Sequence, residues 1–269
     1  MTIYFIGIGP SIKYLSIKAI EVLGRVEKIY IDTYTNIIPD FSVETIRRYC
    51  RGDVEIVYAD RTMLEGRGID AIVREAMEKE IALLVPGDPF IATTHDAIRV
   101  EALAKGVEVR VVYGVSIYSL AASATGLQAY RFGKTVTLVY PRGFKPYSVV
   151  ETIYDNLDRE LHTLLLLDLR IDEGVAMTIG EAVEILLDLE REYGGDKLGD
   201  TIAVGLARLG TDNEYVKADL LPSLAKYNYP PPPHSIVVVA KPHPMELEAL
   251  HLIADLPDNV YSKLLRKRI

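Results

Sequence analysis

The first half of the chain repeats one pattern, in which a short, predominantly apolar run is followed by a stretch with helical periodicity. The apolar runs occupy residues 3–7, 28–32, 55–58, 81–85 and 108–113, and helical patterns occupy residues 16–23, 69–79 and 94–105. Ser16 is a suitable helix N-cap, and Gly24 and Gly106 are suitable stops. Apolar strands that alternate with helices are typical of a parallel sheet covered on both faces. The pattern therefore predicts an α/β fold with a mostly parallel sheet in the N-terminal lobe.

The pattern changes after about Leu127. Strand patterns follow at residues 135–140, 163–167, 201–206, 215–218 and 235–239, and helical patterns at residues 149–159, 178–193 and 245–252. Thr178 and Glu181 have the T-x-x-E spacing of a capping box, which indicates a helix start. Consecutive strands without an intervening helix favour a mixed sheet in the C-terminal lobe. We place the lobes at residues 1–124 and 125–269.

Bulk properties exclude several classes of protein. A length of 269 residues fits two modest domains, and a net charge of -8 gives no support to nucleic-acid binding. No apolar stretch approaches the length of a membrane span, and the single cysteine, Cys50, excludes an intrachain disulfide or a Cys-rich zinc site. The five histidines form no close ligand pair, so we expect no metal site. These features predict a cytoplasmic protein, and the scarcity of Gln, Cys and Trp indicates a heat-adapted source.

A glycine-containing turn, Gly7-Ile8-Gly9-Pro10, follows the first predicted strand. Ligands of parallel sheets bind at the carboxyl ends of strands, where glycine lets the backbone approach them closely. A dinucleotide fingerprint would need a third glycine at position 12, which is Ile12, although Asp32 could act as its ribose-binding acid. A tight turn without a ligand is the remaining interpretation of this segment.

The segment Pro86-Gly87-Asp88-Pro89 follows the wholly apolar run 81–85 and predicts a rigid turn at a strand end. Asp88 either faces a ligand there or only forms the turn, and Thr94 is a candidate N-cap for the next helix. Ser116 has the same two interpretations after the following strand. His234 lies between a polyproline run and a buried strand, so its backbone position is well fixed.

Together these segments resemble the diphthine synthases, which are class III, tetrapyrrole-methylase-like S-adenosylmethionine methyltransferases, and the archaeal members in particular. The resemblance extends over essentially the whole chain. The matching stretches are YFIGIG (4–9), PGDPFIATTHDAIR (86–99), SIYS (116–119), TGLQAYRFGK (125–134), LHTLLLLDL (161–169), MTIGEA (177–182), LARLG (206–210) and PPH (232–234). PGDP alone marks the wider group, whereas ATTH, HTLL and PPH downstream mark the diphthine branch.

The resemblance implies a two-lobed homodimer that binds S-adenosyl-L-methionine in the cleft between the lobes. It implies repeated methylation of the amine of the 3-amino-3-carboxypropyl group on one histidine of translation elongation factor 2. It names no catalytic base. The residues that it implies for cofactor contact are Pro10, Asp88, Ile91, Ser116, Ile117, Leu167, Leu209 and His234. Leucine is common in the family at position 10 and alanine at position 209, so contact at these two positions is expected through the backbone.

Three rival functions stay open at this point. The first is a methylase of the same fold that acts on a cobalamin or sirohaem precursor. The second is a dinucleotide-dependent oxidoreductase that uses Gly7, Gly9 and Asp32. The third is a binding module without catalysis. Binding of S-adenosylmethionine, of a nicotinamide cofactor, or of neither would separate an S-adenosylmethionine methylase from the other two.

Overall fold

The computed structural model describes residues 1–266, and its contacts divide them into two compact units. The first unit comprises Met1–Ile117 with Arg170–Val175, and the second comprises Tyr118–Leu169 with the rest of the described chain from Ala176. The first unit contains β1 (Thr2–Gly9), α1 (Ile17–Leu23), β2 (Lys28–Asp32), α2 (Val43–Arg47), β3 (Glu55–Ala59), α3 (Arg61–Leu64), α4 (Arg67–Glu78), β4 (Ile81–Pro86), α5 (Asp96–Ala104) and β5 (Glu108–Val112).

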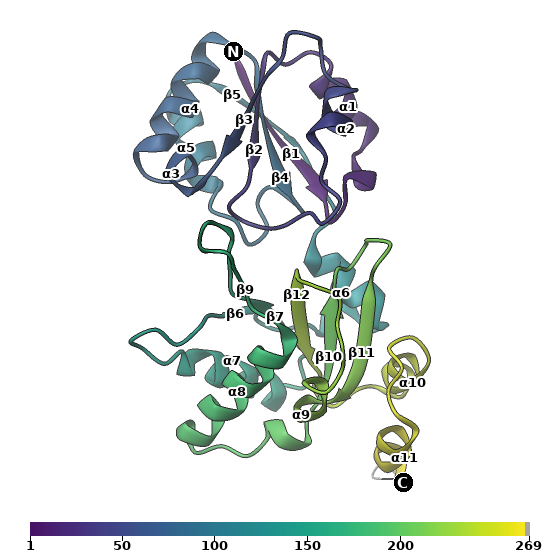
Figure 1. The fold of residues 1–269 in the computed structure, drawn as a ribbon. Coiled ribbons are helices and arrows are strands. Elements are labelled where there is room, and N and C mark those ends of the chain that lie inside the picture. Colours follow the sequence, from purple (N-terminus) through teal and green to yellow (C-terminus); the bar gives the residue numbers. More distant parts are fainter. Residues whose placement is uncertain (267–269) are drawn as a thin grey trace. The chain divides into compact units, whose positions relative to one another are not determined.

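The five strands of the first unit form one parallel sheet in the order β3-β2-β4-β1-β5, as the alternating pattern predicts. Successive residues of β1 point to opposite faces, so Ile3 and Phe5 enter one buried cluster while Tyr4 and Ile6 enter another. Figure 1 shows α1 and α2 on one side of this sheet and α3, α4 and α5 on the other. Apolar cores on both faces explain why the central strands β1 and β4 are so uniformly apolar.

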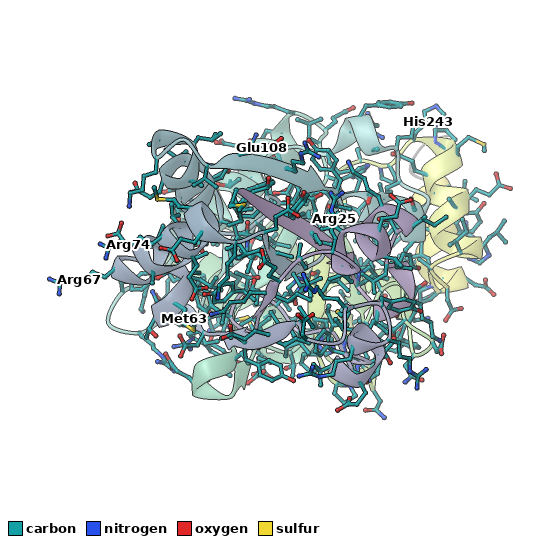
Figure 2. The ribbon with its side chains drawn as sticks, turned by 90° about the horizontal axis from the view of Figure 1, so that it is seen from above. Arg25, Met63, Arg67, Arg74, Glu108 and His243 are labelled. Carbon is teal, nitrogen blue, oxygen red and sulfur yellow. The ribbon has the colours of Figure 1, made fainter. Side chains whose placement is uncertain are left out.

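Helix α4 illustrates how the pattern folds locally. Its buried face consists of Ile72, Val73 and Ala76, whereas Arg67 and Arg74 are exposed. Figure 2 shows the side chains of Arg67 and Arg74 pointing outward from the helix. Burial of the apolar face, rather than helix propensity alone, therefore fixes this segment as a helix.

The second unit contains a mixed sheet in the order β11-β10-β12-β7-β6, in which only β6 and β7 are parallel. The elements that follow β5 are α6 (Ile117–Thr125), β6 (Val136–Leu138), α7 (Tyr147–Asp158), β7 (Thr163–Leu167), β8 (Leu169–Arg170), β9 (Val175–Ala176), α8 (Ile179–Tyr193), β10 (Ile202–Ala207), β11 (Tyr215–Leu220), α9 (Leu221–Leu224), β12 (His234–Val238), α10 (Pro244–Leu252) and α11 (Asp258–Arg266). One apolar core joins α7, α8 and α9 to this sheet. The predicted mixed sheet is confirmed.

Two predicted caps have different outcomes. The capping box is confirmed, because Thr178 Oγ1 accepts a hydrogen bond from Glu181 N and the Glu181 carboxylate accepts one from Thr178 N. The prediction of Thr94 as an N-cap is wrong, because α5 begins at Asp96. The preceding residues fold back on the turn instead, where Thr93 Oγ1 donates a hydrogen bond to the Pro89 carbonyl at 2.6 Å.

The short elements α2, α3, α9 and the β8–β9 pair escape the sequence pattern, and the nine-residue α11 was also not predicted. Helices of four or five residues are too short to display a 3.6-residue period, and two-residue strands display no alternation. Among the described residues, no helix is both long and apolar enough to cross a membrane.

Candidate functional site

The carboxyl ends of β1, β4 and β5 lie next to one another, because these three strands are neighbours in the parallel sheet. Residue Pro10 follows β1, Asp88 and Ile91 follow β4, and Ser116 and Ile117 follow β5. The structure thus brings the five predicted site residues of the first unit to one edge of one sheet. Open α/β sheets bind their ligands at this edge.

Gly7 and Gly114 allow the backbone at this edge to pack closely. A Cβ on Gly114 would lie 2.0 Å from the Gly87 carbonyl oxygen, and a Cβ on Gly7 would lie 2.5 Å from Gly114 N. Gly9 and Gly87 also exchange two backbone hydrogen bonds, at 3.0 and 2.9 Å. We expected Gly7 and Gly9 to give a ligand access to the backbone. The structure corrects the reason for Gly7, whose missing side chain makes room for the neighbouring turns.

Gly87 has a different role from Gly7 and Gly114. Its φ of +71° requires glycine, and a Cβ there would meet only the Val115 carbonyl oxygen, at 3.9 Å. Apart from its chain neighbours, only that oxygen lies within 4 Å of the point where a side chain at position 87 would begin. An uncovered backbone at the ends of parallel strands is a surface on which a ligand can be held by main-chain groups.

The Asp88 side chain holds two of the turns together. It is 8% exposed; its Oδ1 accepts from Phe90 N at 3.0 Å and its Oδ2 from Gly114 N at 3.2 Å. The first bond closes the turn after β4 and the second ties that turn to the end of β5. Asp88 is therefore a turn-forming residue in this structure, and any additional ligand contact would use the remaining lone pairs of its carboxylate.

Asp32 and His95 form a buried contact behind the same turn. Asp32 Oδ1 accepts from Tyr34 N at 2.7 Å and from Thr35 N at 3.0 Å, and its side chain has no exposed surface. The carboxylate therefore binds amides of its own loop and faces His95, so it is not available to bind a ribose. The structure gives no support to the dinucleotide interpretation of Asp32.

In the second unit, three more predicted site residues gather at one edge of the mixed sheet. His234 begins β12 and pairs with Ala207 at the end of β10, and Leu167 ends the antiparallel neighbour β7. Leu209 follows β10 by two residues and is buried, as is Leu167. Antiparallel pairing places the start of β12 beside the ends of β7 and β10, so these residues share an edge.

The His234 imidazole is fully used inside the second unit. Its Nδ1 accepts from Ile179 N, the first residue of α8, at 3.3 Å, and its Nε2–H donates to the Pro230 carbonyl at 2.7 Å. Burial lowers the pKa of His234 and keeps the ring neutral, which the acceptor role of Nδ1 requires. The imidazole thus links helix α8 to the polyproline segment, and any cofactor contact at this position would be through the backbone.

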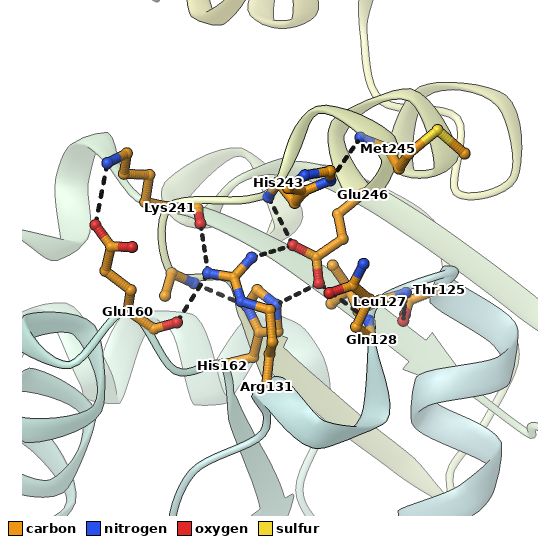
Figure 3. Close-up of polar contacts among 11 residues, drawn as sticks. Thr125, Leu127, Gln128, Arg131, Glu160, His162, Lys241, His243, Met245 and Glu246 are labelled. Carbon is orange, nitrogen blue, oxygen red and sulfur yellow. Dashed lines mark hydrogen bonds and ion pairs between the residues drawn. The ribbon is translucent and has the colours of Figure 1, made fainter.

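A second polar cluster, which sequence reasoning missed, surrounds Glu246 on α10 (Figure 3). Glu246 is 1% exposed; its carboxylate accepts from Gln128 N at 3.0 Å, from His162 Nε2 at 3.1 Å, from His243 N at 2.7 Å and from Arg131 Nη1. His162 Nδ1 accepts from Ala240 N at 3.1 Å, which fixes the tautomer that donates to Glu246.

Three partners of Glu246 lie in two of the diphthine-type segments. Gln128 and Arg131 belong to TGLQAYRFGK and His162 belongs to LHTLLLLDL. Their shared partner, Glu246, lies more than eighty residues further along the chain, and no local sequence motif indicates this role. Gln128, Arg131 and His162 therefore fasten α10 to the rest of the second unit.

The other titratable candidates are accounted for by local contacts. The Cys50 thiol donates to the Ile46 carbonyl, and burial raises its pKa, so the thiolate nucleophile is disfavoured. His243 caps α10 and His251 stacks on Tyr261. Among the described residues, no group of three His, Cys, Asp or Glu side chains could hold a metal ion.

Comparison with known proteins defines the class first. The model of the Tetrapyrrole (Corrin/Porphyrin) Methylases matches residues 2–225, which is most of the chain and includes both candidate edges up to Leu209. A match of that extent, on this fold, makes the protein a methyltransferase. His234 and the α10 and α11 helices lie beyond the matched segment.

The relatives define the branch. The chain is 61% identical to diphthine synthase of Staphylothermus marinus over 97% of both chains, and 38% identical to that of Archaeoglobus fulgidus over 94% and 96% of the two chains. A crystal structure of diphthine synthase superimposes with a TM-score of 0.86 at 36% identity, covering 97% of this chain and 99% of that one. The chain belongs to the diphthine synthase family.

Proposed function

We propose that this methyltransferase trimethylates the amine of the 3-amino-3-carboxypropyl group carried by one histidine of translation elongation factor 2, giving diphthine. The observation that carries the proposal is the 61% identity to a diphthine synthase over 97% of both chains. The Glu246 cluster supports the same branch, because Gln128 and His162 lie in diphthine-type segments and bind Glu246 on α10, beyond the residues that the general methylase model matches.

We propose S-adenosyl-L-methionine as the cofactor. The residues that would hold it are Pro10, Asp88, Ile91, Ser116 and Ile117 of the first unit and Leu167, Leu209 and His234 of the second. The uncovered backbone at Gly87 fits such a ligand, and the engaged side chains of Asp88 and His234 favour main-chain contacts.

The cofactor would supply an electrophilic methyl group on a sulfonium centre. The protein's part is to hold the acceptor amine, in its neutral form, in line with the carbon–sulfur bond. Alignment of two reactants can lower the activation barrier by roughly 7–11 kcal/mol, so this chemistry does not require an acid–base pair. We assign no catalytic base, and aromatic faces or carboxylates would be suitable neighbours for the cation that grows with each methylation.

Mass spectrometry of the target peptide tests the reaction. Purified enzyme with S-adenosylmethionine should add up to three methyl groups to archaeal elongation factor 2 that already carries the aminocarboxypropyl histidine. The unprimed factor should stay unmodified, because an imidazole nitrogen lacks the reach of the aliphatic amine. No mass gain on the primed factor, together with turnover of a tetrapyrrole precursor, would move the assignment to the other methylase branch.

We further propose that the enzyme is a cytoplasmic homodimer from a heat-adapted archaeon, as the family resemblance implies. Light scattering of the eluting protein tests the dimer, and a monomer at micromolar concentration would contradict it. The absence of Trp and the single Gln and Cys are the features of composition that favour heat adaptation. Melting in a calorimeter tests this point directly.

A further inference from the structure

Asp32 and His95 are a buried pair of ionisable side chains that the proposed chemistry does not use. Asp32 ends β2, and His95 precedes α5 in the ATTH segment. Both side chains have no exposed surface. Burying two ionisable groups costs free energy unless each forms polar contacts. The contacts of Asp32 and His95 therefore indicate which part of the structure the pair stabilises.

The first contact fixes one ring nitrogen of His95. Its Nδ1 lies 3.0 Å from the Pro89 carbonyl oxygen, which can only accept, so Nδ1 carries a hydrogen and donates it. The same oxygen also accepts from Thr93 Oγ1 at 2.6 Å. Two donors thus hold the carbonyl of the residue that follows Asp88 in the turn.

The second contact concerns the other ring nitrogen. His95 Nε2 lies 3.3 Å from Asp32 Oδ2, without the alignment of a hydrogen bond and with no other hydrogen-bond partner. Asp32 is thus the acidic side chain that faces this nitrogen of the ring.

We propose that Asp32 and His95 are positioning residues of the cofactor site. The Asp32 carboxylate faces Nε2 of His95 and orients the ring, and the Nδ1–H of His95 holds the Pro89 carbonyl and with it the turn that carries Asp88. The chain of contacts runs from the end of β2 to the end of β4, and through Asp88 to Gly114 at the end of β5. This inference rests on the proposed use of that edge by S-adenosylmethionine.

Conservative variants separate the two contacts. Asp32→Asn keeps one oxygen for the Tyr34 and Thr35 amides but removes the charge opposite His95. His95→Asn keeps a donor near the position of Nδ1, and His95→Gln keeps one near the position of Nε2. Asp53→Asn is the matched control, because Asp53 is a 72% exposed carboxylate on the same unit.

The free protein gives the first readout. Nitrogen NMR of labelled histidine should show a hydrogen-bonded proton on His95 Nδ1 in the wild type and in Asp53→Asn. Exchange of the Phe90 and Gly114 amides, which both donate to Asp88, should accelerate in Asp32→Asn and His95→Gln and stay closer to wild type in His95→Asn. A His95 ring without a proton on Nδ1, or unchanged exchange in Asp32→Asn, overturns the inference.

Calorimetric titration with S-adenosylmethionine gives the second readout. We expect affinity to fall about tenfold in Asp32→Asn and His95→Gln, with partial recovery in His95→Asn, at temperatures well below each variant's melting point. Wild-type affinity in Asp32→Asn contradicts the inference. If the wild type itself fails to bind, the cofactor proposal fails, and the histidine signal and amide exchange still decide whether the pair positions the turn.

Discussion

The Asp88 carboxylate reaches from the end of β4 to the end of β5, where its Oδ2 accepts a hydrogen bond from Gly114 N at 3.2 Å. Its Oδ1 accepts from Phe90 N, so one side chain closes a turn and ties it to the neighbouring strand. This relationship changes what a substitution at position 88 should do.

Asp88→Ala leaves the Phe90 and Gly114 amides without their acceptor, and Asp88→Asn directs an NH₂ group at one of them. Each buried unsatisfied group costs roughly 1–3 kcal/mol, so both variants should melt lower than wild type. We also expect both to bind S-adenosylmethionine about tenfold or more weakly, as measured by calorimetry. Wild-type stability and affinity in Asp88→Asn would show that these two bonds are dispensable.

Gly114→Ala would place a Cβ 2.0 Å from the Gly87 carbonyl oxygen and 2.8 Å from Gly7 Cα. Relief requires backbone movement, so the free energy of unfolding should fall by about 1–3 kcal/mol or more. Gly180→Ala is the control, because nothing lies within 4 Å of its added Cβ in α8, and it should be stabilised by up to about 1 kcal/mol. Equal effects at the two positions in denaturant unfolding would refute the close packing of these turns.

Glu246→Gln should be strongly destabilising, because the Arg131 guanidinium loses its charged partner inside the cluster. Breaking a buried pair typically costs about 3–5 kcal/mol. Glu160→Gln removes an exposed pair with Lys241 and should cost at most about 1 kcal/mol. Chemical denaturation of both variants measures the difference, and a small loss in Glu246→Gln would mean that α10 is held mainly by apolar packing.

The same cluster predicts loss of stability in acid. Burial lowers the pKa of His162 against the opposing effect of Glu246, so below its ordinary value of 6.5 the unfolded chain takes up the proton first. Burial tends to raise the pKa of Glu246, but the Gln128 and His243 amides and His162 lower it overall, so below 4.5 the unfolded chain again binds the proton first. The melting temperature should therefore fall as the pH drops from 6.5 towards 4.5, and less steeply in His162→Gln.

His234→Ala tests whether that imidazole contacts the cofactor. The variant loses the acceptor for Ile179 N and the donor to the Pro230 carbonyl, so its melting temperature should drop. Affinity for S-adenosylmethionine, measured well below that temperature, should change less than in Asp88→Ala. A larger loss of affinity than in Asp88→Ala would give the side chain a direct part in binding.

Features that depend only on residues close together in the sequence could be predicted. The apolar runs of the first half predict the parallel strands, because a strand buried on both faces must be apolar throughout. Thr178 and Glu181 predict the start of α8, because both partners of a capping box lie within one turn. The motifs PGDPFIATTH and PPH also placed the chain in its family, as the 61% identical relative confirms.

The partners of the buried polar side chains were decided only by the tertiary structure. The contacts of Asp88 with Gly114, of Asp32 with His95 and of His162 with Glu246 join residues 26 to 84 positions apart. No periodicity encodes such a pair, because the partners meet only after the order of strands and the packing of helices bring them together. The sequence by itself determined the main strands, most of the longer helices and the family, and the packing of those elements decided which side chains shape the candidate site.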